Sequence, residues 1–385
     1  MRSRVGRIRA TVLFACTVAT LASAGAAWGV PPSPCASNEG VRIAPPASGA
    51  YHFGYFSPTP NERTVTRDSI DEFETLAGRP VAGVVFSDPW GTRGKLTIGF
   101  PTRKVRTIWR HGAVPVVRFT PWTRMVQGRR DPIISMQRII NGRFDAALLR
   151  WFRAAAATEI PMMIDVGVEV NGDWFPWNGR YNGGGVRDRY GDPSYPDGPE
   201  RYRDAYRHLV RLARRPDVDA DNLTWTFHVD AGGWPDRWWN QPRWYYPGDR
   251  YVDWITVSVY GEQVPSGRPE RWTSFTDQLG DPDDPDSPYA RIRAISEARP
   301  LGLIEVGVTE DPDAGDKGAW IAEAFAAVRD GTYDFDLVSW WHERWRNGSG
   351  KISNLRIDSS PGALAAYRDA VADPFFGARL RFVCG

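Results

Sequence analysis

Two acidic residues stand in apolar stretches of the sequence, and together they could hydrolyse a glycosidic bond. Glu169 lies in Met-Ile-Asp-Val-Gly-Val-Glu-Val-Asn-Gly-Asp-Trp-Phe-Pro-Trp, residues 163–177, and Glu305 in Leu-Gly-Leu-Ile-Glu-Val-Gly, residues 301–307. A charge in an apolar run is costly unless it is paired or used. Glycoside hydrolysis uses one acid to protonate the departing oxygen and one carboxylate to attack the sugar or activate water; carboxyl groups about 5–5.5 Å apart give retention, and about 6.5–9.5 Å inversion. The alternative is two structural glutamates held by arginines or backbone amides.

The elements that must position these acids are short apolar runs that alternate with amphipathic segments. Eight runs of five to seven residues have the β-branched and aromatic composition of buried strands: Tyr51–Phe56, Val81–Phe86, Val114–Phe119, Met162–Val168, Leu223–Phe227, Trp254–Val259, Leu301–Val306 and Leu337–Trp341. Five segments have apolar residues at helical spacing: Ser69–Ala77, Phe144–Ala157, Pro199–Ala213, Ala319–Val328 and Pro361–Val371. Ser360 and Pro361 form a start signal for the last helix.

Strands that alternate with helices indicate a parallel α/β sheet, and the count of eight favours a single-domain (β/α)8 TIM barrel. The competing fold is an open doubly wound sheet, but no Gly-x-Gly-x-x-Gly turn follows the first run. In a barrel, Glu169 and Glu305 both lie at the carboxyl ends of strands and can converge on one cleft. The long connections 171–198 and 229–250 lie on the same face.

The stretch around the first acid resembles glycoside hydrolase family 26, the family of β-mannanases and some mixed-linkage β-glucanases. The family's acid/base strand reads roughly His-Glu-Met-Asn-Gly-x-Trp-x-x-Trp, and the chain has Val-Glu-Val-Asn-Gly-Asp-Trp-Phe-Pro-Trp at 168–177. A second family signature, a Glu followed by an apolar residue and Gly, is similar to Glu305-Val306-Gly307. The resemblance runs from about residue 50 to residue 372.

The resemblance implies a retaining mechanism in a barrel with its catalytic acids on strands four and seven. Glu305 would be the nucleophile, and Glu169 the general acid and then the general base. Tyr260 would hydrogen-bond the nucleophile, and Trp341 would form the floor of the subsite for the reacting sugar. The remaining substrate-binding candidates are Trp90, Asn171, Trp174, Trp177 and His228. Tyr260 could instead be a core tyrosine, Trp174 and Trp177 could pack the long loop, and Asn171 could hold either the substrate or Glu169.

Two positions depart from the family pattern. The histidine that precedes the acid/base is Val168 here, and the arginine usual earlier in that strand is Asp165. A negative charge at Asp165 would raise the pKa of a neighbouring acid. His228 and His342, at the ends of the fifth and eighth runs, are candidates to replace the lost imidazole, although a lone histidine is more often structural.

The composition of the 385 residues excludes several classes of partner. Lys+Arg 48 against Asp+Glu 46 gives +2, and four arginines lie in the first ten residues, so the chain beyond residue 30 carries 44 basic against 46 acidic residues, or −2. Nucleic acid and anionic membranes require a basic face, so neither is expected as the main partner. Eighteen Trp exceed the needs of a core and suit stacking on sugars.

The first 29 residues have the charged, apolar and small-residue order of a secretory signal peptide. We expect its cleavage to leave a protein with no membrane span, secreted or periplasmic. A Pro/Ala/Ser-rich lead at 30–49 precedes the barrel domain at 50–385. Cys35 and Cys384 then form an even pair near the two ends, which predicts a disulfide in an oxidising compartment.

The residues thus predict a secreted retaining glycoside hydrolase that acts on a β-linked polysaccharide or oligosaccharide, with endo-β-1,4-mannan hydrolysis favoured. Mixed-linkage β-glucan, xylan and exopolysaccharide are alternative substrates, and a non-catalytic carbohydrate-binding barrel is an alternative function. No Gly-x-Ser-x-Gly, His-Glu-x-x-His or Cys-x-x-Cys motif is present, so we expect no cofactor or metal. We also expect a monomer. The aspartate-rich turn 281–286 has prolines at two positions and lacks the bidentate Glu of a calcium loop.

Overall fold

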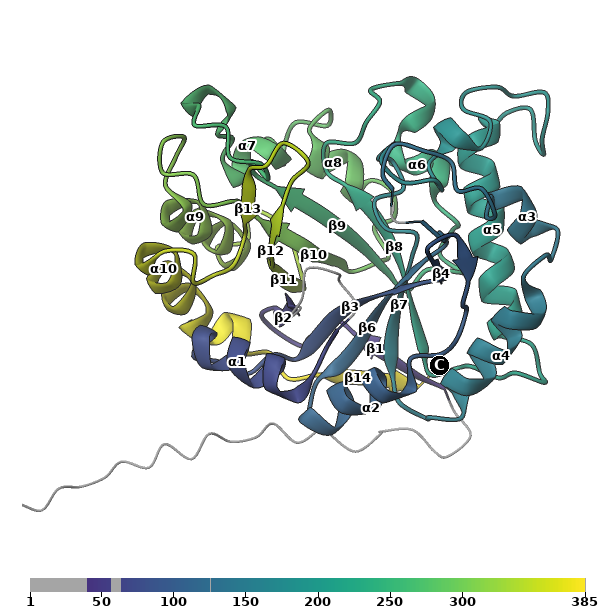
Figure 1. Ribbon diagram of the computed structural model, residues 1–385, viewed down its shortest axis with the longest axis horizontal. Coiled ribbons are helices and arrows are strands. Elements are labelled where there is room, and N and C mark those ends of the chain that lie inside the picture. Colours follow the sequence, from purple (N-terminus) through teal and green to yellow (C-terminus); the bar gives the residue numbers. More distant parts are fainter. Residues whose placement is uncertain (1–39, 57–63, 125, 385) are drawn as a thin grey trace, which may run out of the picture.

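Eight parallel strands close into a barrel at the centre of the molecule (Figure 1). The computed structural model describes residues 40–56, 64–124 and 126–384. Around the barrel the strand order is β10-β11-β2-β3-β6-β7-β8-β9. The strand bounds are β2 Tyr51–Phe56, β3 Gly83–Pro89, β6 Val114–Thr120, β7 Met162–Val166, β8 Leu223–Asp230, β9 Trp254–Tyr260, β10 Leu301–Gly307 and β11 Leu337–His342. All eight apolar runs are therefore strands, and the predicted (β/α)8 barrel is confirmed.

Helices surround the barrel on its outer side (Figure 1). The α-helices are α1 Arg67–Ala77, α2 Thr102–His111, α3 Met136–Ile140, α4 Asp145–Ala156, α5 Asp197–Ala213, α6 Pro242–Tyr245, α7 Phe275–Leu279, α8 Pro288–Arg293, α9 Lys317–Arg329 and α10 Pro361–Ala372. Short 3₁₀ helices span Gly179–Tyr181, Trp238–Asn240, Pro269–Arg271 and Pro374–Gly377. The five predicted helices are α1, α4, α5, α9 and α10. The others escaped the sequence analysis because α2 has only Val105 and Ile108 buried and the rest are six residues or fewer.

Local capping explains where the predicted helices begin. The Ser360 hydroxyl accepts the Ala363 amide at the start of α10, with Pro361 in the first turn, as the sequence predicts. The Thr66 and Ser69 side chains satisfy each other's backbone amides at the start of α1, and Gly78 ends that helix at φ 73°.

The inward-facing side chains of the barrel change from apolar to polar along the strands. Val116 on β6 and Met163 on β7 belong to the apolar interior. Because side chains alternate between the two faces of a strand, the next inward positions are Arg118 and Asp165, which are paired in register. The barrel thus carries a buried layer of polar residues above its apolar layer, on the side of the carboxyl ends.

The opposite end of the barrel is closed by a two-stranded sheet. β1 (Val41–Ala44) pairs antiparallel with β14 (Arg381–Cys384), and the Ile43 carbonyl accepts the Trp254 indole N–H at 2.8 Å. The lead expected at 30–49 therefore contains a strand, because Val41 and Ile43 can be buried. Cys384 lies opposite Val41. Cys35 and the predicted signal peptide lie outside the described residues.

Smaller elements complete the description. The hairpins β4 (Gly91–Thr92) with β5 (Lys95–Leu96) and β12 (Arg344–Arg346) with β13 (Ile352–Asn354) follow β3 and β11. The 281–286 segment is an exposed turn in which Asp281 and Asp284 accept backbone amides. Within the described part of the chain, no helix is both long and apolar enough to cross a membrane.

Candidate active site

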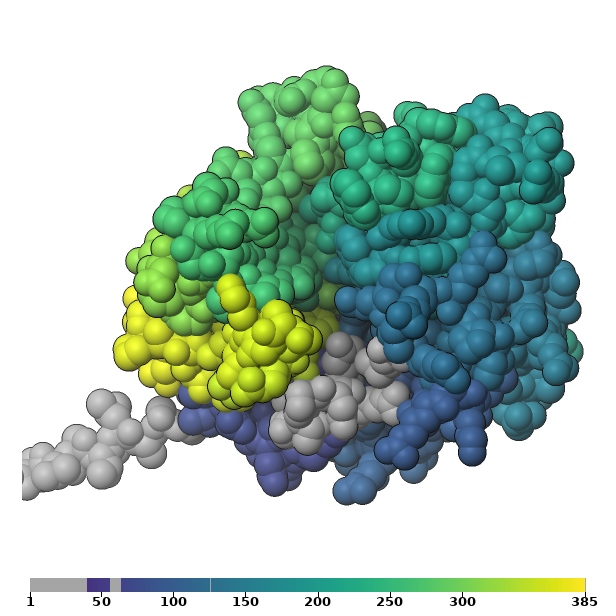
Figure 2. Space-filling view, turned by 45° about the horizontal axis from the view of Figure 1, so that its top comes forward, coloured from purple at the N-terminus to yellow at the C-terminus, as the bar shows by residue number. Residues whose placement is uncertain are grey.

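The carboxyl ends of β7 and β10 bring Glu169 and Glu305 into one electrostatic neighbourhood. The charge of Glu169 raises the pKa of Glu305, and both carboxylates raise the pKa of Tyr260. Both glutamates are buried, with 7% and 3% of their surface exposed. Two residues 136 positions apart in the chain therefore share one region at the mouth of the barrel. Figure 2 shows a hollow between the green and yellow C-terminal half and the blue and teal part of the molecule.

Glu305 on β10 is held by Tyr260 from the adjacent strand β9 and by Arg118 from β6, across the barrel. The Arg118 Nε lies 2.9 Å from Oε1, and the Tyr260 hydroxyl donates to Oε2 at 2.9 Å. Burial raises the pKa of Glu305 to about 7, Arg118 opposes this rise, and Glu169 adds to it. Burial and the Glu305 charge raise the pKa of Tyr260 well above its usual value, so Tyr260 is a neutral phenol that donates. The predicted contact of Tyr260 with Glu305 is present.

Glu169 lies beyond its strand rather than at its end. β7 stops at Val166, and Gly167 and Glu169 have φ of 58° and 49°. A positive φ is unfavourable for a residue with a side chain and persists only where the surroundings enforce it. Here the Trp174 indole N–H donates to Glu169 Oε2 at 2.5 Å, and the Val170 amide donates to the His228 carbonyl. This turn aims the carboxylate at the mouth, a detail that apolar patterning cannot reveal.

Asp230, at the end of β8, is a third carboxylate of this region, and the sequence analysis missed it. Burial raises the pKa of Asp230 to about 7, and the Glu169 charge raises it further, whereas the Gly233 and Gly232 amides lower it. The fifth strand was predicted to end at Phe227, whereas β8 runs to Asp230. The signal that could have found Asp230 is its spacing from His228, which places both on one face of the extended strand.

Asn171 connects the two strand ends. Its amide group donates to the Asp230 carbonyl, and its carbonyl oxygen accepts the Asp230 amide, both at 2.8 Å. Only 3% of Asn171 is exposed. The side chain therefore fixes β8 beside the turn that holds Glu169, and its contact with Glu169 is indirect.

His228 lies beneath the glutamates instead of facing a substrate. Its ring nitrogens lie 2.8 Å from Asp165 Oδ2 and 2.8 Å from Ser258 Oγ, and His228, Asp165 and Ser258 are fully buried. Burial lowers the pKa of His228, but Asp165, Glu305 and Glu169 outweigh it and the net direction is upward. No atom of the ring reaches the surface of this structure, and the ring compensates the negative charge of the carboxylates around it.

The two departures from the family pattern have structural consequences. Val168 is buried, and its carbonyl accepts the Trp177 indole N–H at 2.7 Å. Asp165 is among the charges that raise the pKa of Glu305, as predicted. Although Asp165 stands where the family has an arginine, a guanidinium still reaches Glu305. It comes from Arg118 on β6, the strand that pairs with β7. His342 accepts the Ile357 amide and packs edge-on against Phe73 of α1, on the outer side of the barrel.

The four predicted tryptophans differ in their surroundings. Trp90 is 1% exposed against Phe119, and Trp177 is fully buried and stacked on Phe175 at 4.5 Å. Both rings belong to the buried core in this structure. Trp174 is half-buried beside Glu169.

Trp341 lies beside the groups that hold Glu305. The Arg118 guanidinium is 4.8 Å from its ring centroid, and Tyr260 is edge-on at 6.4 Å. Tyr55 stacks on Trp341 at 3.6 Å and covers one ring face. The Trp341 ring therefore lies beside Glu305, the candidate nucleophile.

A parallel eight-stranded barrel with a paired glutamate site at its carboxyl end is the architecture of a class of retaining glycoside hydrolases. Residues 133–272 match the profile of glycosyl hydrolase family 26. This segment, which holds Glu169, Asp230 and Tyr260, is similar to that family of retaining enzymes, and the chain as a whole has the fold of solved mannanases.

Three solved structures illustrate the fold. Bacillus subtilis mannanase man26 has a TM-score of 0.52 at 16% identity, over 85% of this chain and 86% of its own. A Cellulomonas fimi endo-beta-1,4-mannanase double mutant has a TM-score of 0.55 at 16% identity, over 85% and 71%. A beta-mannanase from a symbiotic protist of the termite Reticulitermes speratus, complexed with gluco-manno-oligosaccharide, has a TM-score of 0.54 at 12% identity, over 90% and 96%.

A curated relative extends the comparison at the level of sequence. Endoglucanase H of Acetivibrio thermocellus is 27% identical over 308 residues, which are 80% of this chain. The chain spans 29% of the length of that relative.

Proposed function

We propose that this chain is a secreted retaining glycoside hydrolase that cleaves β-linked polysaccharide. The observation that carries the proposal is the buried pair of Glu169 and Glu305, with Arg118 and Tyr260 on Glu305 and Trp174 on Glu169. The two carboxyl groups have different partners. Retaining hydrolysis needs this asymmetry, because one carboxyl must attack while the other delivers a proton.

In the proposed mechanism the Glu305 carboxylate attacks the anomeric carbon, and Glu169 protonates the departing glycosidic oxygen. A covalent glycosyl-enzyme forms, with the bond to the leaving sugar broken. Glu169, now ionised, removes a proton from water, which displaces Glu305 and returns both groups to their starting state. The Tyr260 hydrogen bond keeps Glu305 aligned, and the Arg118 charge favours its ionised form.

We propose β-1,4-mannan as the first substrate to test, since the solved structures with this fold include mannanases. β-Glucan is the second, because the curated relative is an endoglucanase. The signal-like first 29 residues support export. Cys35 precedes Val41 by six residues, and Val41 lies opposite Cys384, which supports the proposed disulfide between the chain ends.

The test is the release of new reducing ends from mannan, glucomannan, lichenan and xylan. Glu169→Gln and Glu305→Gln should each abolish release, with Glu270→Gln, at an exposed position in the Pro269–Arg271 turn, as the matched control. NMR of the first product formed should show retained anomeric configuration. Full turnover by either glutamine variant, or an inverted first product, would refute the proposed mechanism.

A further inference from the structure

The near-zero net charge of the chain hides an uneven distribution along the sequence. Residues 91–150 contain thirteen lysines and arginines against two acids, a net charge of +11. The rest of the chain beyond residue 30 contains 31 basic against 44 acidic residues, a net charge of −13. The basic excess is thus concentrated in the segment that supplies the loops after β3 and β6, on the same barrel face as the glutamate pair.

Exposed cations gather on the loop between β6 and α3. Arg124, Arg129 and Arg130 are exposed, and none of the three lies within ion-pair distance of a carboxylate among the residues that the structure describes. Asp131, the acid of this loop, is engaged by the backbone amides of Thr123, Ile133 and Ile134. The loop 121–135 thus carries three arginines against one aspartate, a net charge of +2.

Arg118 and the arginines of this loop line separate hollows whose walls include residues adjacent in the sequence. A first hollow of about 50 Å³ is lined by Arg118, which contacts Glu305, and by Gln127 and Phe175. A second, of about 180 Å³, is lined by Arg124, Arg129 and Arg130 and by the acidic Asp131, together with Pro176, the neighbour of Phe175.

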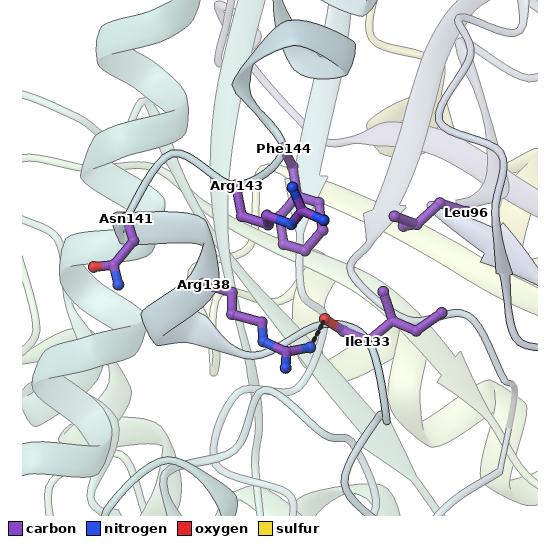
Figure 3. A pocket seen from close by; sticks show the side chains of 6 residues that line it. All are labelled: Leu96, Ile133, Arg138, Asn141, Arg143 and Phe144. Carbon is purple, nitrogen blue, oxygen red and sulfur yellow. Dashed lines mark hydrogen bonds between the residues drawn. The ribbon is translucent and has the colours of Figure 1, made fainter.

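Two larger hollows are also lined by arginines. Arg130 also lines a third hollow, of about 390 Å³, which includes Arg189 and Arg201. On the other side of the loop, a hollow of about 620 Å³ is lined by Arg138, Arg143 and Asn141, with Leu96 of the β4–β5 hairpin across from them (Figure 3). Arg138 is fixed there by a hydrogen bond to the Ile133 carbonyl at 2.7 Å.

We propose that the glycan cleaved at the glutamate pair carries anionic groups, carboxylate or sulfate, and that the loop arginines bind them in subsites beyond the reacting sugar. This inference rests on the proposed function and names the class of its substrate. Arginine is suited to the role because its guanidinium forms bidentate hydrogen bonds with carboxylate and sulfate-like oxygens.

The charge at the glutamates explains why the anionic groups bind further away. Asp165, Glu169, Asp230 and Glu305 form a cluster of four carboxyl groups beside Arg118 and His228, and the charge of one raises the pKa of another. An anionic substituent on the sugar under attack would be repelled by this cluster. The site therefore suits a neutral sugar at the point of cleavage and charged substituents along the arginine loop.

The test uses three probes that share one β-1,4-glucan backbone: carboxymethyl-cellulose, cellulose sulfate and neutral hydroxyethyl-cellulose. Affinity electrophoresis of the Glu305→Gln protein measures binding without cleavage. We expect stronger retardation by a charged probe than by the neutral one. In the same background, Arg129→Gln/Arg130→Gln should weaken binding of the charged probe about fivefold, at roughly 0.5 kcal/mol for each exposed charge pair, and leave the neutral probe unchanged.

The matched control is Arg103→Gln/Arg106→Gln, which removes two exposed charges of the same segment on α2. It should leave binding unchanged. Equal loss from both double variants, equal retardation by all three probes, or duplex DNA bound with the same sensitivity to Arg129 and Arg130 would overturn the proposal. The carboxymethyl and sulfate probes distinguish the two anionic groups. Failure of the wild-type protein to release reducing ends from any polysaccharide would refute the proposed function separately, whatever the binding result.

Discussion

Replacing Arg118 by Met should remove most activity at neutral pH and restore part of it at higher pH. Arg118 and Glu305 are 4% and 3% exposed, with Nε and Oε1 2.9 Å apart, so solvent screens their interaction little. Burial already raises the pKa of Glu305 to about 7 with the guanidinium present. An opposite charge this close typically lowers a carboxyl pKa by roughly 1–3 pH units, and its loss lets the pKa of Glu305 rise further.

The nucleophile must be ionised, so the consequence for the rate has a definite sign. At pH 7 about half of Glu305 is ionised in the native protein, given a pKa of about 7. A rise of 1 unit would leave roughly a tenth ionised, so kcat/KM at pH 7 should fall at least about fivefold. The acid limb of the activity–pH profile should move to higher pH by the same amount.

The assay is kcat/KM from pH 5 to 9 on the best polysaccharide found for the wild type, with thermal unfolding at each pH. Ser87→Ala is the control, because the Ser87 hydroxyl accepts a hydrogen bond from Arg118 Nη1 at 3.0 Å and its loss leaves the ion pair intact. An acid limb that stays at its wild-type pH in a folded Arg118→Met protein would show that Arg118 does not control the ionisation of Glu305.

Three further predictions concern the same site and the chain ends. Glu169→Gln should lower the pKa of Asp230 from about 7, because the Glu169 charge helps to raise it; carboxyl NMR titration measures this, and an unchanged value would contradict the coupling. In the folded state Glu305 has a raised pKa, so native protein holds more protons than unfolded protein between about pH 4.5 and 7, and the free energy of unfolding should fall as pH rises through this window. Glu305→Gln should remove up to about 3 kcal/mol of that fall, measured by denaturant unfolding at pH 4.5 and 7; equal slopes in both proteins would exclude Glu305 as the cause. Unfolded, unreduced mature protein should contain no free thiol if Cys35 and Cys384 are bonded, and a count of two would remove the proposed disulfide.

The buried polar layer explains why removing single residues from this site has large effects. Four carboxylates of the region are accompanied by Arg118 and by His228, whose pKa the carboxylates raise. Each buried charge is tolerated because another compensates it, and a protein interior penalises the one that loses its partner. The site is therefore a coupled unit, and its ionisation states respond together.

The sequence by itself determined the barrel and the face that carries the chemistry. Eight runs of apolar residues define strands buried on both faces, and in a parallel barrel every carboxyl end points to the same side, so Glu169 and Glu305 had to share that side. The contact of Tyr260 with Glu305 was predicted from the family resemblance, and the hydrophobic pattern alone would not have indicated it.

Tertiary structure alone decided which side chains reach the site. Trp90 and Trp177 follow predicted strands at the face that carries the glutamates, yet both rings pack into the core. The path of a loop, and not its composition, decides which ring is covered. Arg118 and Asp230 enter through strand register, which pairs residues from distant parts of the chain. The hydrophobic pattern constrains register, but which side chains meet across the barrel depends on packing summed over the whole structure, so local sequence does not fix it alone.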